Sequence, residues 1–80
     1  MAGLRGSAHG EDRWLRRAPP RYRTVSAWRQ ALATAEPVGP LPSGALEYRA
    51  CGMRLIAVGG VVATVLPLGW PADGKHFAED

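Results

Sequence analysis

The chain has 80 residues, a single cysteine (Cys51) and a formal net charge of +3. A chain of this length builds one domain with a thin core, and one cysteine excludes an internal disulfide framework and a metal site made of the chain's own cysteines. We therefore expect a small domain without a cofactor or a bound metal, in a reducing compartment such as the cytoplasm. Residues 1–10 contain no apolar core of signal-peptide length, which argues against export.

The positive charge is concentrated in the first part of the chain. Residues 1–29 contain seven arginines and two acidic residues, a net charge of +5, whereas residues 30–80 have a net charge of −2. The planar guanidinium of arginine binds phosphate through paired hydrogen bonds and stacks on bases. This distribution favours nucleic-acid binding, although a solvated arginine face is the commoner meaning of such a run. The arginines that we expect to contact nucleic acid are Arg13, Arg16, Arg17, Arg21, Arg23 and Arg29.

Two helices are predicted before residue 37. Ser7 is a good N-cap for a first helix that runs to about Ala18, where two prolines end it. Thr24 or Ser26 caps a second helix, whose apolar residues recur at helical spacing. The segment 37–44 is rich in proline and glycine, and we expect a stiff loop there, because proline cannot donate a hydrogen bond to a strand ladder.

The next part of the chain predicts an antiparallel β-meander. Residues 45–50, 53–58 and 61–66 are three six-residue segments separated by Cys51-Gly52 and Gly59-Gly60, and such glycine-containing pairs suit tight hairpin turns. The expected fold is α+β, with two N-terminal helices packed on a three-stranded antiparallel meander. Its parts are a flexible N-terminus (1–6), a single domain (7–68) and a polar tail (69–80).

The turns also predict the register of the strands and therefore their two faces. The predicted pairs are Ala50 with Met53, Tyr48 with Leu55, Leu46 with Ala57, Ala57 with Val62, Leu55 with Thr64 and Met53 with Leu66. These residues form one apolar face for the helices. A second apolar patch remains on the other face, and we interpret it as a partner or dimer surface. It consists of Ile56, Val58, Val61, Ala63 and Val65.

An alternative interpretation is a single membrane span. Residues 55–72 form an uncharged run of eighteen residues, which is long enough to be considered a span. The glycine pair in its middle, Pro67 and the polar Thr64 argue against that interpretation. We therefore favour a globular domain over a membrane-spanning protein.

A short helical motif points to a family. Ser7, His9, Arg13 and Arg17 follow the pattern S-x-H-x-x-x-R-x-x-x-R, before a second helix and a meander that closes on residues 60–66. In this the chain resembles small RNase-toxin-like proteins of the barnase–EndoU–colicin–RelE group, including relatives in phage and mobile-element genomes. The resemblance covers about residues 7–67 through short, degenerate motifs. It implies two N-terminal helices on an antiparallel sheet and, in active members, cleavage of RNA without a metal.

Metal-independent cleavage of RNA needs an acid, a base and cations that stabilise the phosphorane. Histidine is the side-chain type whose ordinary pKa lies nearest neutrality and so suits acid–base work, which makes His9 a candidate, and Arg13 and Arg17 follow it on the same side of the helix. Thr64 and Tyr48 supply hydroxyl groups on the face predicted to meet the helices. These five residues are the candidate catalytic set, although each also has an ordinary structural explanation.

The sequence thus leaves three functions open. The first is an RNase-toxin-like domain that binds RNA or a nucleic-acid-bearing complex through its arginines, with or without RNA cleavage. The second is a catalytically silent accessory or inhibitor protein that binds a protein partner, or a second copy, through its apolar sheet face. The third is the single-pass membrane protein.

Overall fold

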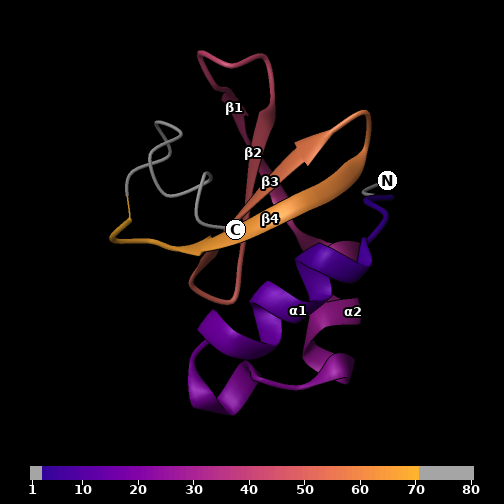
Figure 1. Ribbon diagram of the computed structural model, residues 1–80, viewed down its shortest axis with the longest axis vertical. Helices are drawn as coiled ribbons and strands as arrows, with labels where there is room; N and C mark the ends of the chain where they lie inside the picture. The colour runs from indigo at the N-terminus through magenta and orange to yellow at the C-terminus, as the bar shows by residue number, and fades with distance from the viewer. Residues whose placement is uncertain (1–2, 71–80) are drawn as a thin grey trace.

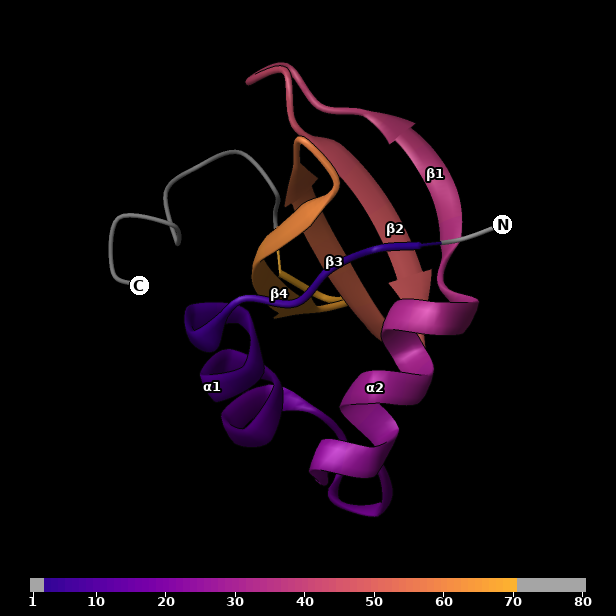
Figure 2. The same cartoon turned by 90° about the vertical axis from the view of Figure 1, so that its right-hand side faces the viewer.

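A computed structural model describes residues 3–70 of the protein. Two helices lie on one side of a four-stranded antiparallel sheet with the order β1-β2-β3-β4 (Figure 1, Figure 2). The elements are α1 (Ala8–Arg17), the short 3-10 helix η1 (Pro20–Tyr22), α2 (Val25–Thr34), β1 (Glu36–Pro40), β2 (Leu46–Ala50), β3 (Met53–Val58) and β4 (Val61–Pro67). The predicted α+β class is confirmed, but the sheet has four strands where we expected three.

Both helices begin where their capping residues predicted. The hydroxyl of Ser7 accepts a hydrogen bond from the backbone N–H of Gly10 at 2.9 Å, and that of Thr24 accepts one from Ala27 at 3.1 Å. Each cap satisfies a backbone donor that has no partner inside its helix. Thr24, rather than Ser26, is therefore the cap of α2.

The additional strand is β1, in the segment that was expected to be a loop. Pro37 pairs with Tyr48 and Pro40 with Leu46, with an irregularity between Pro37 and Gly39. β1 lies at the edge of the sheet and pairs on one side only. Edge strands tolerate proline, because half of their backbone groups have no strand neighbour. The prediction of a loop was wrong for residues 37–40, because it applied there a rule that holds for central strands, and it is confirmed for residues 41–44.

The two hairpin turns form at the predicted glycine pairs. Cys51 and Gly52 have φ angles of 54° and 74°, and Gly59 and Gly60 have φ angles of 61° and 81°. Two successive positive φ angles are the signature of the turns that match the twist of paired strands. The register predicted between β2 and β3 is confirmed at all three pairs, among them Tyr48 with Leu55.

The register between β3 and β4 is confirmed near the turn and wrong beyond it. Ala57 pairs with Val62 as predicted, but Ile56 pairs with Thr64, so Ala63 is an extra residue in β4. This bulge moves every later side chain of β4 to the opposite face. Leu55 therefore pairs with Val65 instead of Thr64, and Met53 pairs with Pro67 instead of Leu66.

The bulge decides which side chains form the core under the helices. Val65 joins this core, whereas Thr64 and Leu66 do not. Trp14 and Trp28 meet at its centre, with ring centroids 5.6 Å apart. The buried members of this core are Trp14, Ala18, Trp28, Ala31, Ala35, Met53, Leu55, Val62 and Val65.

A smaller apolar cluster lies on the other side of the sheet. Ala45, Ile56 and Leu66 are buried there, and Leu41 and Trp70 pack against them. The chain's own loops thus cover part of the face that the sequence left open. The sheet is consequently buried on both faces near Ile56.

The outer edge of β4 is covered by the N-terminal segment and α1. Arg5 donates a backbone hydrogen bond to Gly60 and accepts one from Val62, at 2.9 and 2.8 Å, although residues 1–6 were expected to be flexible. The hydroxyl of Ser7 donates to the carbonyl of Val62 at 2.7 Å. Gly10 lets α1 approach closely, because a Cβ atom there would lie 2.9 Å from that same carbonyl oxygen. The start of α1 is therefore fixed against the sheet.

The segment proposed as a membrane span does not form a helix where the structure describes it. Residues 55–70 contribute to β3, β4 and the turns around them. Within residues 3–70, no helix has the length and apolar character needed to cross a membrane. The predicted polar tail beyond Trp70 lies outside the described residues.

Candidate functional site

The five candidate catalytic residues do not gather at one point. His9 and Thr64 line a common hollow, whereas Tyr48 packs against the core on the helix side of the sheet. Arg13 and Arg17 make contacts elsewhere along α1. The prediction that Thr64 faces the helices was wrong, because the bulge at Ala63 turns it to the other face.

The hollow is a concave surface of about 320 Å³ beside the start of α1. Four apolar side chains, from β3, β4 and the residue before β2, make most of its lining, and three polar side chains come from α1, β4 and the β1–β2 loop. Within residues 3–70, none of its lining residues is acidic. They are His9, Ser43, Ala45, Ile56, Val58, Ala63 and Thr64.

An acidic residue sits among the arginines of α1. The carboxylate of Asp12 lies 2.7 Å from a guanidinium nitrogen of Arg13 and 3.1 Å from one of Arg16. The Arg16 side chain is 69% exposed, so its ion pair is worth little in water and leaves the guanidinium accessible. Together these three side chains carry a net charge of +1.

Arg17 has a structural position at the end of α1. Its guanidinium donates to the backbone carbonyl of Val65 at 3.0 Å and lies 4.7 Å from the centre of the Trp70 ring. A cation over an indole ring is attracted by the negative face of the ring. Arg17 therefore holds α1, β4 and the residues after β4 together.

The connector between the helices carries two more arginines. Arg23 donates twice to the carbonyl of Ala18, at 3.1 and 2.9 Å, and so satisfies the C-terminal end of α1. Arg21 lies over the ring of Tyr22 at 5.6 Å. Both arginines are exposed. Their contacts orient them while leaving donor groups open to solvent.

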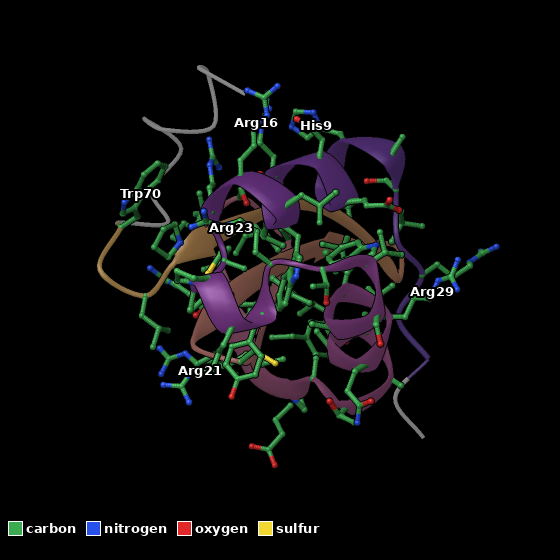
Figure 3. All side chains as sticks on the ribbon, turned by 90° about the horizontal axis from the view of Figure 1, so that it is seen from below. His9, Arg16, Arg21, Arg23, Arg29 and Trp70 are labelled. Carbon is green, nitrogen blue, oxygen red and sulfur yellow. The ribbon has the colours of Figure 1, made fainter. Side chains whose placement is uncertain are left out.

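The exposed arginines of the helical layer fall into two places. Arg16, Arg23 and Arg21 follow one another along one side of the layer, and Arg29 projects from the opposite side (Figure 3). We call Arg16, Arg21 and Arg23 the basic edge. The six arginines predicted to bind nucleic acid thus include three exposed neighbours, two partly buried residues (Arg13 and Arg17) and the distant Arg29.

A buried ion pair lies on the outer face of the sheet. Arg54 donates to both carboxylate oxygens of Glu47, at 2.8 and 2.9 Å, and Arg49 adds a contact at 3.3 Å. The hydrogen bonds from Arg54 hold the pKa of Glu47 below its ordinary value, against the opposing effect of burial. Arg54 also donates to the carbonyl of Trp70. This cluster ties the segment after β4 to the sheet.

The sequence contained a signal for the buried ion pair that we did not use. The predicted register placed Arg49 opposite Arg54, and so placed Glu47 diagonally across from Arg54 on the same face, where long side chains meet. No comparable signal exists for the contact of Arg17 with Trp70. Trp70 lies beyond the last predicted element, so its position could not be derived from pairing.

The predicted partner face is divided by the fold. Val65 lies in the core under the helices, and Ile56 is buried in the smaller cluster. Val58 and Ala63 are exposed, and Val61 is half-buried. The assignment of Val65 to that face was wrong because of the bulge. What remains apolar and accessible there is mainly the wall of the hollow.

Comparisons with known proteins add no further identification. No protein-family model matches the chain, and neither the curated proteins nor the solved structures provide a significant match. Among residues 3–70, no group of three or more histidine, cysteine, aspartate or glutamate side chains is placed to hold a metal ion. The function must therefore be argued from the site itself.

Proposed function

We propose that the protein is a small RNA-binding domain that holds the phosphate backbone of single-stranded RNA along the basic edge. The observation that carries this proposal is the row of exposed guanidinium groups of Arg16, Arg21 and Arg23 on one side of the helical layer. Guanidinium groups bind phosphate oxygens through paired, charge-assisted hydrogen bonds. The net charge of +5 over residues 1–29 adds a long-range attraction for a polyanion.

The local contacts of the basic edge support phosphate binding. Arg23 is anchored at Ala18 and Arg21 lies over Tyr22, so neither side chain has to be ordered entirely at the moment of binding. The resemblance to RNase-toxin-like proteins agrees with RNA as the ligand.

Binding is better supported than cleavage. An RNase site of this type needs an acid, a base and a cation within reach of one phosphate. His9 and Thr64 share the hollow, but Tyr48 lies on the other face of the sheet and Arg17 is engaged with Val65 and Trp70. We therefore propose an RNA-binding role of the RNase-toxin-like type, in which turnover is not required.

The proposal is tested by the salt dependence of binding to a fluorescently labelled single-stranded RNA. Three phosphate contacts give a slope of log K against log salt of about −2, which is a roughly 20-fold loss of affinity between about 50 and 200 mM salt. Arg16→Gln and Arg21→Gln should each lower the affinity and reduce the slope by about 0.7.

Arg49→Gln is the matched control. It removes the same charge from an exposed arginine on the outer face of the sheet, where Arg54 alone still pairs with Glu47. This variant should keep the slope of the wild type. Absence of salt-dependent RNA binding by the wild type, or an equal loss in all three variants, would refute an RNA site at the basic edge.

A further inference from the structure

The hollow next to α1 has the volume and the lining of a site for a small, partly apolar group. Its volume of about 320 Å³ falls at the lower end of the range for ligand pockets. Ala45, Ile56, Val58 and Ala63 supply an apolar lining, while Ser43 and Thr64 contribute hydroxyl groups. A ligand that matches this surface has an apolar flat body with hydrogen-bonding groups at its edge.

The bulge in β4 is the reason that the hollow exists in this form. Because Ala63 is the extra residue, the strand bends there, and a small exposed side chain is placed in the wall of the hollow. Thr64 consequently turns away from the helices and lines the same wall. A regular β4 would have left Thr64 under the helices.

The hollow adjoins one end of the basic edge. His9 lines it, and Arg16 lies seven residues further along α1, which is two turns and about 10 Å on the same face of the helix. The two side chains project side by side from the helix (Figure 3). An RNA whose phosphate contacts Arg16 therefore has its neighbouring nucleotides close to the hollow.

We infer that the hollow binds one unstacked base of the RNA held at the basic edge, an inference that rests on the proposed function. Proteins recognise single-stranded RNA by drawing out bases, which stack on aromatic or histidine rings and form hydrogen bonds through their edges. In this site the imidazole of His9 supplies the ring at the rim, and the hydroxyl group of the exposed Ser43 meets the edge of the base. Within residues 3–70 the lining includes no acidic side chain, which suits a ligand attached to phosphates.

The test compares a single-stranded RNA with an abasic oligomer of the same length and charge. The wild type should bind the base-bearing RNA about tenfold more tightly, within the range measured for stacking of single bases. Ala63→Leu fills the hollow and His9→Ala removes its ring, so each variant should bind the two oligomers with nearly equal affinity. Both positions are exposed, which makes these changes compatible with folding.

Ala33→Leu is the matched control, because it makes the same change at an exposed alanine of α2, outside the hollow. It should keep the tenfold preference. Salt-dependent binding of both oligomers by the wild type with equal affinity would overturn the base site while leaving the proposed function intact. The same conclusion would follow if Ala63→Leu and His9→Ala both kept the preference. Absence of binding to either oligomer would remove the proposed function and the base site together.

Discussion

The contact between α1 and β4 makes Gly10→Ala a sensitive test of the fold. An added Cβ atom would lie 2.9 Å from the carbonyl oxygen of Val62, 3.1 Å from the hydroxyl oxygen of Ser7 and 3.2 Å from the ring of Trp28. The first neighbour is backbone within a sheet, and the third is a buried ring. Neither can move without disturbing its own packing, so α1 must shift away from β4.

The size of the effect follows from three contributions. Overpacking of this kind costs about 1–3 kcal/mol. A shift of α1 also weakens the 2.7 Å hydrogen bond from Ser7 to Val62, which contributes about 1 kcal/mol. Replacing glycine by alanine in a helix returns at most about 1 kcal/mol. The net loss is about 1–3 kcal/mol in the free energy of unfolding, or about 4–24 °C in Tm.

Urea unfolding followed by tryptophan fluorescence measures this loss, since Trp14 and Trp28 are both buried. Gly69→Ala is the control, because a Cβ atom there meets nothing within 4 Å, and its midpoint should equal that of the wild type. A Gly10→Ala protein as stable as the wild type, or more stable, would show that α1 does not lie against the edge of β4 as described.

Two further changes test the charged groups. Asp12→Asn removes the carboxylate that pairs with Arg13 and Arg16. Titration with labelled RNA should therefore show a higher affinity and a steeper dependence on salt. Unchanged or weaker binding would contradict the role of Arg16. The lowered pKa of Glu47 stabilises the fold above the ordinary glutamate pKa of 4.5, and this stabilisation is lost as the pH falls through the lowered value. Glu47→Gln should therefore be less stable than the wild type at neutral pH and lose less stability on acidification, which thermal unfolding between about pH 5 and 2 measures. Parallel acid profiles for the two proteins would rule out that account.

Local signals were sufficient to predict most of the fold. Ser7 predicted the start of the first helix, Thr24 was one of the two caps predicted for the second, and the glycine pairs predicted both hairpins. These predictions succeeded because capping and tight turns depend on a few neighbouring residues. The β2–β3 register followed from its turn for the same reason.

The errors in register and in strand number came from packing and topology, which the local sequence pattern does not specify. The bulge at Ala63 was not visible in the sequence, because β4 alternates acceptably in either register, and only packing under the helices selects Val65 over Thr64. The strand character of residues 36–40 depends on a place at the edge of the sheet, which is a property of the whole topology.

The candidate site was predictable in its residue types and less so in its arrangement. The excess of arginine before residue 30 indicated a basic surface, but burial and ion pairing divide these arginines into different roles. Arg17 serves the fold through Val65 and Trp70, while Arg16 stays accessible. His9 was singled out by its residue type, and its position beside the hollow could not be derived without the bulge.

Both borders of the sheet hinder strand addition within the described part of the chain. On one side the backbone of Arg5 already forms hydrogen bonds with the start of β4. On the other side Pro37 and Pro40 supply no backbone N–H donors in β1. Open strand borders invite intermolecular pairing and fibrous aggregation. We therefore expect the protein to resist strand-to-strand association when it is concentrated.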